Sequence, residues 1–152
     1  QARRDRPVEV KHLAKSLFTI LVFGTYTASL KAETPQLNYL RHCQGCHGDA
    51  GQGSVRNSVP ELEKAITKFL VYPEGREYLV QVADISQSPI ADQELADLLN
   101  WMIKSFGTKE IQRKFVPYNA TEISEPRLNR PANTRELRQK LTVKSIHSAV
   151  SD

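Results

Sequence analysis

The sequence predicts an all-α protein built around one main domain. The clearest sign is the segment 92–106, whose apolar side chains follow the spacing of one helical face. Residues 62–70 repeat this spacing, and no segment alternates between apolar and polar residues for long enough to form a sheet. At 152 residues, the chain is long enough for one domain and too short for two full ones.

Residues 1–32 have the pattern of an export signal or an N-terminal membrane anchor. A basic stretch ends at Lys15, and an apolar stretch of about 15 residues follows it, shorter than the roughly 20 needed to span a bilayer. Ala32 is small enough to precede a cleavage point, although Leu30 is not the small residue preferred before it. We expect cleavage, with an uncleaved anchor or a buried core helix as alternatives; either of the first two places the body outside the cytoplasm.

Two cysteines form the most specific motif of the chain. Cys43, Cys46 and His47 make the pattern C-x-x-C-H, which is the signature of c-type haem attachment. The thiols lie about one helical turn apart, as they must to reach two vinyl groups on one porphyrin edge, and the adjacent imidazole can bind the iron. A structural zinc site would need a second pair of thiolates, and a thioredoxin-like pair would follow a strand. We therefore expect one covalently bound haem c per chain, with His47 as the proximal iron ligand.

Short elements are expected around this motif. Residues 35–46 predict a helix that delivers the cysteines, with Leu37, Leu40 and Tyr39 as the candidates to face inward. Three glycines follow within six residues, which favours a loop whose backbone passes close to a flat ligand over a plain flexible turn. These glycines are Gly48, Gly51 and Gly53.

The next elements lead to the clearest helix. Helical spacing over 62–70 is interrupted at Pro73, and a second short segment carries Tyr78 and Val82. Residues 84–90 read as a loop, and a helix over 92–106 ends before Gly107. Its apolar stripe consists of Leu95, Leu98, Leu99, Met102, Ile103 and Phe106.

The composition changes at Thr108, after which prolines and charges are frequent. We expect 108–152 to be a C-terminal extension that is partly packed on the body through residues 115–118 and otherwise extended and mobile. A weak terminal helix would carry Leu137 and Leu141. The predicted organisation is thus a signal or anchor at 1–32, a main domain at 33–107 and this extension.

The net charge of +4 is unevenly distributed. Residues 1–32 carry +4, residues 33–107 carry −4, and residues 108–152 carry +4. Because the basic charge lies at the two ends, one of them expected to be removed, a nucleic-acid partner is not expected. The split between body and extension instead offers patches that could steer a transient protein partner.

The body resembles small bacterial class I cytochromes c. The resemblance rests on residues 43–48, Gly51, Gly53, the run Pro60-Glu-Leu62 and a last body helix with Trp101. The segments 40–47, 73–82, 88–102 and 115–118 are similar, more narrowly, to proteobacterial mono-haem cytochromes, some of them linked with amine-oxidising systems. The similarity covers residues 37–131.

This resemblance implies a class I cytochrome c fold, with about four short helices around one covalently bound haem. It also implies that the first and last helices cross beside the haem, which would bring Trp101 near Leu37 and Leu40. The carbonyl of Pro60 would accept a hydrogen bond from His47. A simple loop proline is the alternative for Pro60.

The sixth iron ligand is where the sequence departs from the family. The expected loop, residues 84–91, has no methionine, and the only Met of the chain is Met102. Met102 is a candidate distal ligand, but a Met within an apolar stripe is more often a core residue. His42 belongs to the proximal side, and His147 would reach the iron only if the extension folded over the distal face.

These features predict an electron carrier rather than an enzyme, periplasmic and either soluble or anchored to the inner membrane through its N-terminus. Its haem would cycle between Fe(III) and Fe(II), and its partners would be redox proteins such as a dehydrogenase or a terminal oxidase or reductase. It would be a monomer or form transient complexes, with no other membrane contact. The alternatives are a haem protein with an open distal face, acting as a small-ligand sensor or enzyme, and a haem subunit of a membrane oxidoreductase complex.

Overall fold

The computed structural model describes the backbone of residues 32–150 and the side chains of residues 32–144. Over this part the chain is helical, and its only extended pairing is an isolated bridge between Ser54 and Val59. The predicted all-α class is therefore confirmed. The expected export or anchor segment lies, apart from Ala32, outside the described residues. None of the helices described is both long and apolar enough to cross a bilayer.

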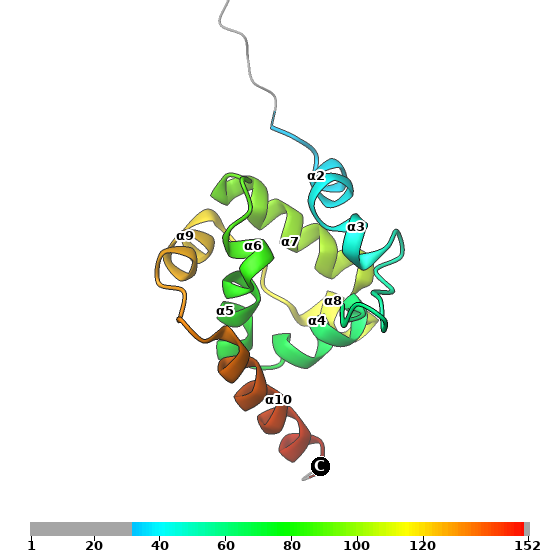
Figure 1. Cartoon of the computed structure of the whole chain (residues 1–152), viewed down its shortest axis with the longest axis vertical. Coiled ribbons are helices and arrows are strands. Elements are labelled where there is room, and N and C mark those ends of the chain that lie inside the picture. The colour runs from blue at the N-terminus through cyan, green and yellow to red at the C-terminus, as the bar shows by residue number, and fades with distance from the viewer. Residues whose placement is uncertain (1–31, 151–152) are drawn as a thin grey trace, which may run out of the picture. The chain divides into compact units, whose positions relative to one another are not determined.

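The described residues form one compact unit of packed helices (Figure 1). The helices are α2 (Pro35–His42), α3 (Gln44–His47), α4 (Leu62–Leu70), α5 (Pro73–Gln81), α6 (Ala83–Ser86), α7 (Asp92–Phe106), α8 (Lys109–Lys114), α9 (Ala120–Leu128) and α10 (Thr134–Val150).

Local sequence signals account for where several helices begin and end. The hydroxyl of Thr34 accepts a hydrogen bond from the amide of Leu37, and proline opens both α2 and α5. Helix α7 ends at Gly107, whose amide donates to the carbonyl of Ile103. A Cβ atom at Gly107 would lie 2.6 Å from that carbonyl oxygen, so the predicted stop depends on the missing side chain.

Helix α7 supplies the centre of the core. It packs against α2, α4, α8 and α9, and its predicted apolar stripe is buried except for Phe106, which is half-buried. Tyr39 from α2, Leu62 and Ile66 from α4, and Ile90 from the segment before α7 join the same core. Burying one large apolar side chain contributes about 1.5–3 kcal/mol, so this stripe is the main source of stability for the site that α2 and α3 carry.

The body contains six helices, α2 to α7, whereas the resemblance implies about four. Residues 44–47 and 83–86 each form a four-residue helix, because their amides find carbonyls within a single turn. The segment expected as a loop after residue 84 therefore begins inside α6. Helix α2 also differs, since Tyr39 is buried while Leu40 is 57% exposed. Only one face of this short helix meets α7, and Leu40 lies outside that face.

The C-terminal part is more helical than predicted. The sequence predicts packing through residues 115–118, one weak terminal helix and otherwise an extended, mobile chain, whereas the described residues after Gly107 form three helices; the mobility stays a prediction. Asn119 and Glu122 form a reciprocal capping box that starts α9 despite the nearby prolines. Ile123 has no exposed surface and Tyr118 has 4%, so this segment is packed as tightly as the body.

Helix α10 packs against α4 and α5 (Figure 1). Leu141 is buried against Phe69 and Tyr78, and Leu137 packs beside them, as the predicted apolar face of a terminal helix requires. The division of the chain at residue 107 stays a prediction, because residues on both sides share one compact unit.

Candidate functional site

The C-x-x-C-H motif occupies a single helical turn. Cys43 ends α2 and precedes α3, and its carbonyl accepts hydrogen bonds from the amides of Cys46 and His47 at 3.2 and 3.0 Å. Residues three positions apart on such a turn lie on the same face. Cys43 is half-buried, Cys46 is exposed, and both thiols are free. The turn therefore presents two thiols side by side, with an imidazole directly after them.

The imidazole of His47 is oriented by a backbone contact. Its Nδ1 atom lies 3.2 Å from the carbonyl oxygen of Pro60. A carbonyl can only accept, so the contact requires Nδ1 to carry the proton and leaves Nε2 with a free lone pair. The contact that the resemblance implied for Pro60 is present, and it prepares Nε2 to bind a metal ion.

Gly53 makes this contact possible. The amide of Gly53 donates to the carbonyl of His47 at 2.8 Å, and its φ of 66° lies in the left-handed region. A Cβ atom there would lie 2.5 Å from the carbonyl oxygen of Val59 and 2.6 Å from that of Pro60. The glycine-rich loop is thus explained by the approach of the chain's own backbone; its expected approach to a flat ligand stays a prediction.

Burial sets the protonation of the motif at neutral pH. It lowers the pKa of His47, against the opposing effects of the Pro60 hydrogen bond and of the Asp84 carboxylate. Burial also raises the pKa of Cys43 to about 11, with smaller contributions from Asp84 and Cys46. The imidazole is therefore neutral and the Cys43 thiol protonated at pH 7.

Asp84 was not foreseen from the sequence. Its exposed carboxylate acts electrostatically on both Cys43 and His47, although less strongly than burial does. No local pattern links residue 84 to a motif some forty positions earlier, and only the packed chain brings them together.

An aromatic cluster holds α2 against α7 beside the motif. The ring of Tyr39 lies 5.4 Å from that of Trp101 and 5.2 Å from that of Phe106, between centroids. The Tyr39 hydroxyl donates to the carbonyl of Gly48 at 2.5 Å, directly after the motif. Trp101 was expected near Leu37 and Leu40 on α2; the contact that the structure shows is with Tyr39 of the same helix, and proximity to Leu37 and Leu40 stays a prediction. An aromatic four residues before Cys43 is the signal that could have identified this contact.

The other two candidate ligands with described side chains, Met102 and His42, differ in their burial. Met102 is 7% exposed and belongs to the core formed by the α7 stripe. His42 is exposed at the end of α2, and the side chain of His147 falls outside the described residues. Within the described part, no three or more His, Cys, Asp or Glu side chains gather in a way that could hold a metal ion.

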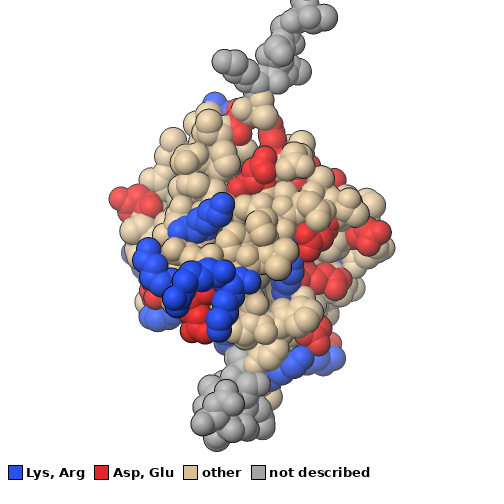
Figure 2. Space-filling model, turned by 180° about the vertical axis from the view of Figure 1, so that it is seen from behind, with Lys and Arg blue, Asp and Glu red and all other residues tan. Residues whose placement is uncertain are grey.

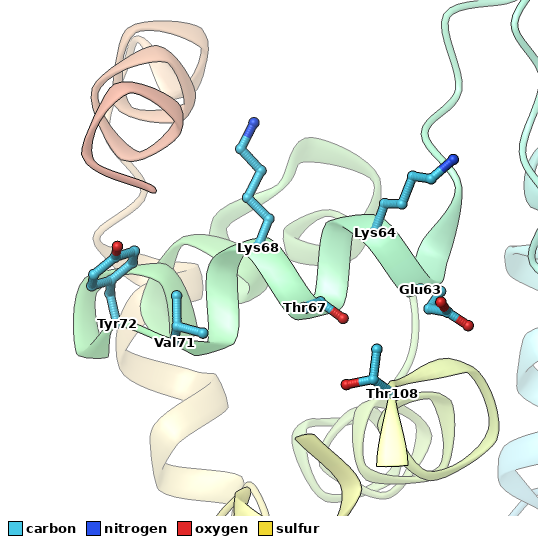
Figure 3. Close-up of a pocket in the computed structure, with 7 residues that line it drawn as sticks. All are labelled: Glu63, Lys64, Thr67, Lys68, Val71, Tyr72 and Thr108. Atoms are coloured by element: carbon cyan, nitrogen blue, oxygen red, sulfur yellow. The ribbon is translucent and has the colours of Figure 1, made fainter. Parts of the chain in front are cut away.

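A surface pocket of about 420 Å³ lies elsewhere, on α4 (Figure 3). It is lined by Glu63, Lys64, Thr67, Lys68, Val71, Tyr72 and Thr108. The pocket contains neither a cysteine nor a histidine. The C-x-x-C-H turn carries two free thiols and an oriented imidazole, and we take it as the candidate site.

Comparison with known proteins finds distant similarity to cytochromes c. The chain is 25% identical over 146 aligned positions to a cytochrome c-552 of Thermus thermophilus, an alignment that covers 83% of this chain and 98% of that protein. A second Thermus thermophilus cytochrome c-552 is 27% identical over 122 positions, 67% of this chain and 92% of the relative. No protein-family model matches the chain, and no solved structure matches it significantly. The chain is thus distantly similar to cytochromes c over most of its length.

Proposed function

We propose that this protein is a c-type electron carrier that binds one haem c covalently through Cys43 and Cys46, with His47 as the proximal iron ligand. The observation that carries the proposal is the 3.2 Å contact between Nδ1 of His47 and the carbonyl of Pro60. It leaves Nε2 as a neutral nitrogen donor directly after two unpaired thiols. Two thiols and one oriented imidazole on a single turn are the donor set that a c-type haem requires.

The residues of the chain would each have a distinct task. When bound, a haem supplies one-electron chemistry, its iron changing between Fe(III) and Fe(II). Cys43 and Cys46 fix the cofactor covalently, and the Pro60 carbonyl fixes the ring of His47 and raises its basicity. The Tyr39 ring, packed on α7, holds the motif in place. Electron transfer of this kind needs no side chain to act as acid or base.

We propose that the protein works in the periplasm, soluble or anchored through its N-terminus, with redox proteins such as a dehydrogenase or a terminal oxidase or reductase as transient partners. The uneven distribution of charge supports such encounters. On the face seen in Figure 2, many of the visible Lys and Arg gather in one group, while most of the visible Asp and Glu lie apart from it. Burial lowers the pKa of Lys68, and the nearby cation Arg138 lowers it further, which indicates that positive charges lie near one another around Lys68. Separated patches of opposite sign raise association rates and orient the partner.

A second candidate function is a haem protein with an open distal face that binds small ligands. The observation that favours it is the location of Met102, which is buried in the hydrophobic core, together with the absence of methionine from residues 84–91. The visible spectrum separates the two candidates. A low-spin spectrum that carbon monoxide does not alter supports the electron carrier, and a high-spin spectrum that carbon monoxide shifts supports the open site.

The proposed function is tested by producing the chain in a host that matures c-type cytochromes. Wild-type protein should retain its pigment after denaturation, and the pigment should change reversibly with reductant and oxidant. A double substitution of Cys43 and Cys46 by Ser should abolish the covalently held pigment. A colourless wild-type protein would overturn the proposal.

A further inference from the structure

One arginine of the C-terminal part is hydrogen-bonded repeatedly to the segment between α6 and α7. The guanidinium of Arg127, on α9, donates to the backbone carbonyls of Ser86, Ser88 and Ile90 at 3.1, 2.7 and 2.9 Å. It also forms an ion pair with Asp92 at 2.6 Å. One side chain therefore binds four acceptors spread over seven residues of another part of the chain.

These contacts are partly buried, and their acceptors are backbone carbonyls of an irregular segment. The Arg127 side chain is only 18% exposed, so its charge-assisted hydrogen bonds are partly shielded from water. The three carbonyls belong to the end of α6 and to the irregular chain that follows it, where regular helical partners run out. Only arginine offers five donors in a rigid planar arrangement, which suits several acceptors at once.

Side-chain contacts with α5 and α7 fix the position of α9, and therefore the position of the Arg127 backbone. Arg76 of α5 forms an ion pair with Glu122 at 2.9 Å. The side-chain amide of Asn100, on α7, donates to the carbonyl of Tyr118 at 2.9 Å and accepts from its amide at 2.7 Å. The residues around α9 thus connect α5, α7 and the segment 86–92.

That segment and the candidate site pack on the same hydrophobic core. It follows α6 directly, and α6 carries Asp84, whose carboxylate acts on both Cys43 and His47. Ile90 belongs to the hydrophobic core, and Ile85 and Cys43 both pack against this core. A displacement of 86–92 would therefore disturb the surroundings of the motif.

We propose that Arg127 is a positioning residue, which fixes segment 86–92 from the C-terminal part of the chain and so completes the wall of the haem site. The inference rests on the proposed function and extends it, since it gives the residues after Thr108 a role in that site. Arg127 acts through the segment that it holds, without contact with Cys43, Cys46 or His47.

The test compares Arg127→Met and Arg127→Lys with the control Arg113→Met in the full-length holoprotein. Arg113 is exposed on α8, and its guanidinium donates to the carbonyl of Lys109 in its own helix, so the control removes the same charge and side-chain length. Asp92→Asn, which weakens the ion pair and leaves the three carbonyl contacts of Arg127 in place, is a milder variant should Arg127→Met fail to fold. Three quantities are measured: hydrogen exchange of the amides of residues 86–88, the visible spectrum and the reduction potential.

We expect exchange at residues 86–88 to rise about tenfold or more in Arg127→Met, as the loss of charge-assisted hydrogen bonds implies. The spectrum or the reduction potential should shift with it, and Arg127→Lys should restore part of both effects. Arg113→Met should match the wild type in all three measurements.

Two results would overturn the inference. One is exchange, spectrum and potential in the Arg127 variants equal to those of Arg113→Met. The other is faster exchange with an unaltered spectrum and potential, since Arg127 would then hold the segment without consequence for the haem site. Failure of the proposed function is recognised separately, because wild-type protein would then carry no covalent pigment at all.

Discussion

The carbonyl oxygen of Pro60 lies 3.2 Å from Nδ1 of His47, although thirteen positions separate the two residues in the chain. The approach depends on Gly53, where a side chain would collide with the carbonyls of Val59 and Pro60. The orientation of His47, the candidate metal ligand, thus depends on a glycine that lies outside the C-x-x-C-H motif.

Gly53→Ala is therefore expected to displace Pro60 from His47. The new Cβ would also force an alanine into the left-handed region, and together these effects should cost about 1–3 kcal/mol of unfolding free energy. The weakened hydrogen bond should make the imidazole less basic, which raises the reduction potential. Denaturant unfolding and a redox titration measure the two effects. Gly45→Ala is the control, because its Cβ would meet no atom within 4 Å beyond its chain neighbours and its own helix backbone; an equal loss in both variants would contradict this explanation.

Met102 can be tested as a core residue and as an iron ligand with two substitutions. Met102→Leu keeps the volume of the side chain and should cost less than about 1.5 kcal/mol, whereas Met102→Ala should cost about 2–5 kcal/mol. If the residue only packs, the visible spectrum of the folded Leu variant should equal that of the wild type. A spectrum that changes in Met102→Leu while stability is kept would identify the thioether as a ligand.

Asp84→Asn should raise the reduction potential of the bound haem. The carboxylate acts electrostatically on His47, and a nearby negative charge stabilises the more positive Fe(III) state. The expected change is on the order of tens of millivolts, since about 59 mV corresponds to a tenfold change in a one-electron equilibrium. Asp97→Asn, exposed on α7, serves as the control for loss of a surface charge. An equal potential in the two variants would argue against the role of Asp84.

The ion pair of Arg76 and Glu122 predicts how stability depends on pH. The hydrogen bond with Arg76 lowers the pKa of Glu122, so the folded state binds this proton less readily than the unfolded state. The stabilisation is therefore complete above the ordinary glutamate pKa of about 4.3 and is lost as the pH falls towards the lower folded value.

Unfolding midpoints of the wild type and Glu122→Gln should thus differ at pH 7 and converge below about pH 4. The effect should be modest, because the Glu122 side chain is 38% exposed and water screens the pair. Glu125→Gln, an exposed neighbour on α9, provides the control. A difference that grows on acidification would have the wrong sign for this pair.

Tyr39→Phe isolates the hydrogen bond between the Tyr39 hydroxyl and the Gly48 carbonyl. The aromatic packing on Trp101 and Phe106 is kept, so the expected loss is about 0.5–1.5 kcal/mol of unfolding free energy. Tyr39→Leu removes the aromatic contacts as well and should cost more. Equal stability of Tyr39→Phe and the wild type would show that the hydroxyl contributes nothing to holding the motif.

Features that depend on neighbouring residues could be derived from the linear chain. The two thiols and the imidazole occur within one helical turn, and the stripe of α7 repeats with the period of a helix, so both follow from local geometry. The inward face of α2 was only partly identified, because Tyr39 and Leu40 are adjacent and helical spacing alone did not choose between them.

Contacts between distant segments needed the folded chain. The carboxylate of Asp84, the guanidinium of Arg127 and the buried packing of Ile123 depend on how helices pack after they form, and no local period encodes that arrangement. The prolines and charges after Thr108 suggested an extended chain, yet end caps and burial against the body outweigh these propensities. Short-range geometry thus established the donor atoms of the candidate site, and long-range packing established the surroundings that orient and enclose them.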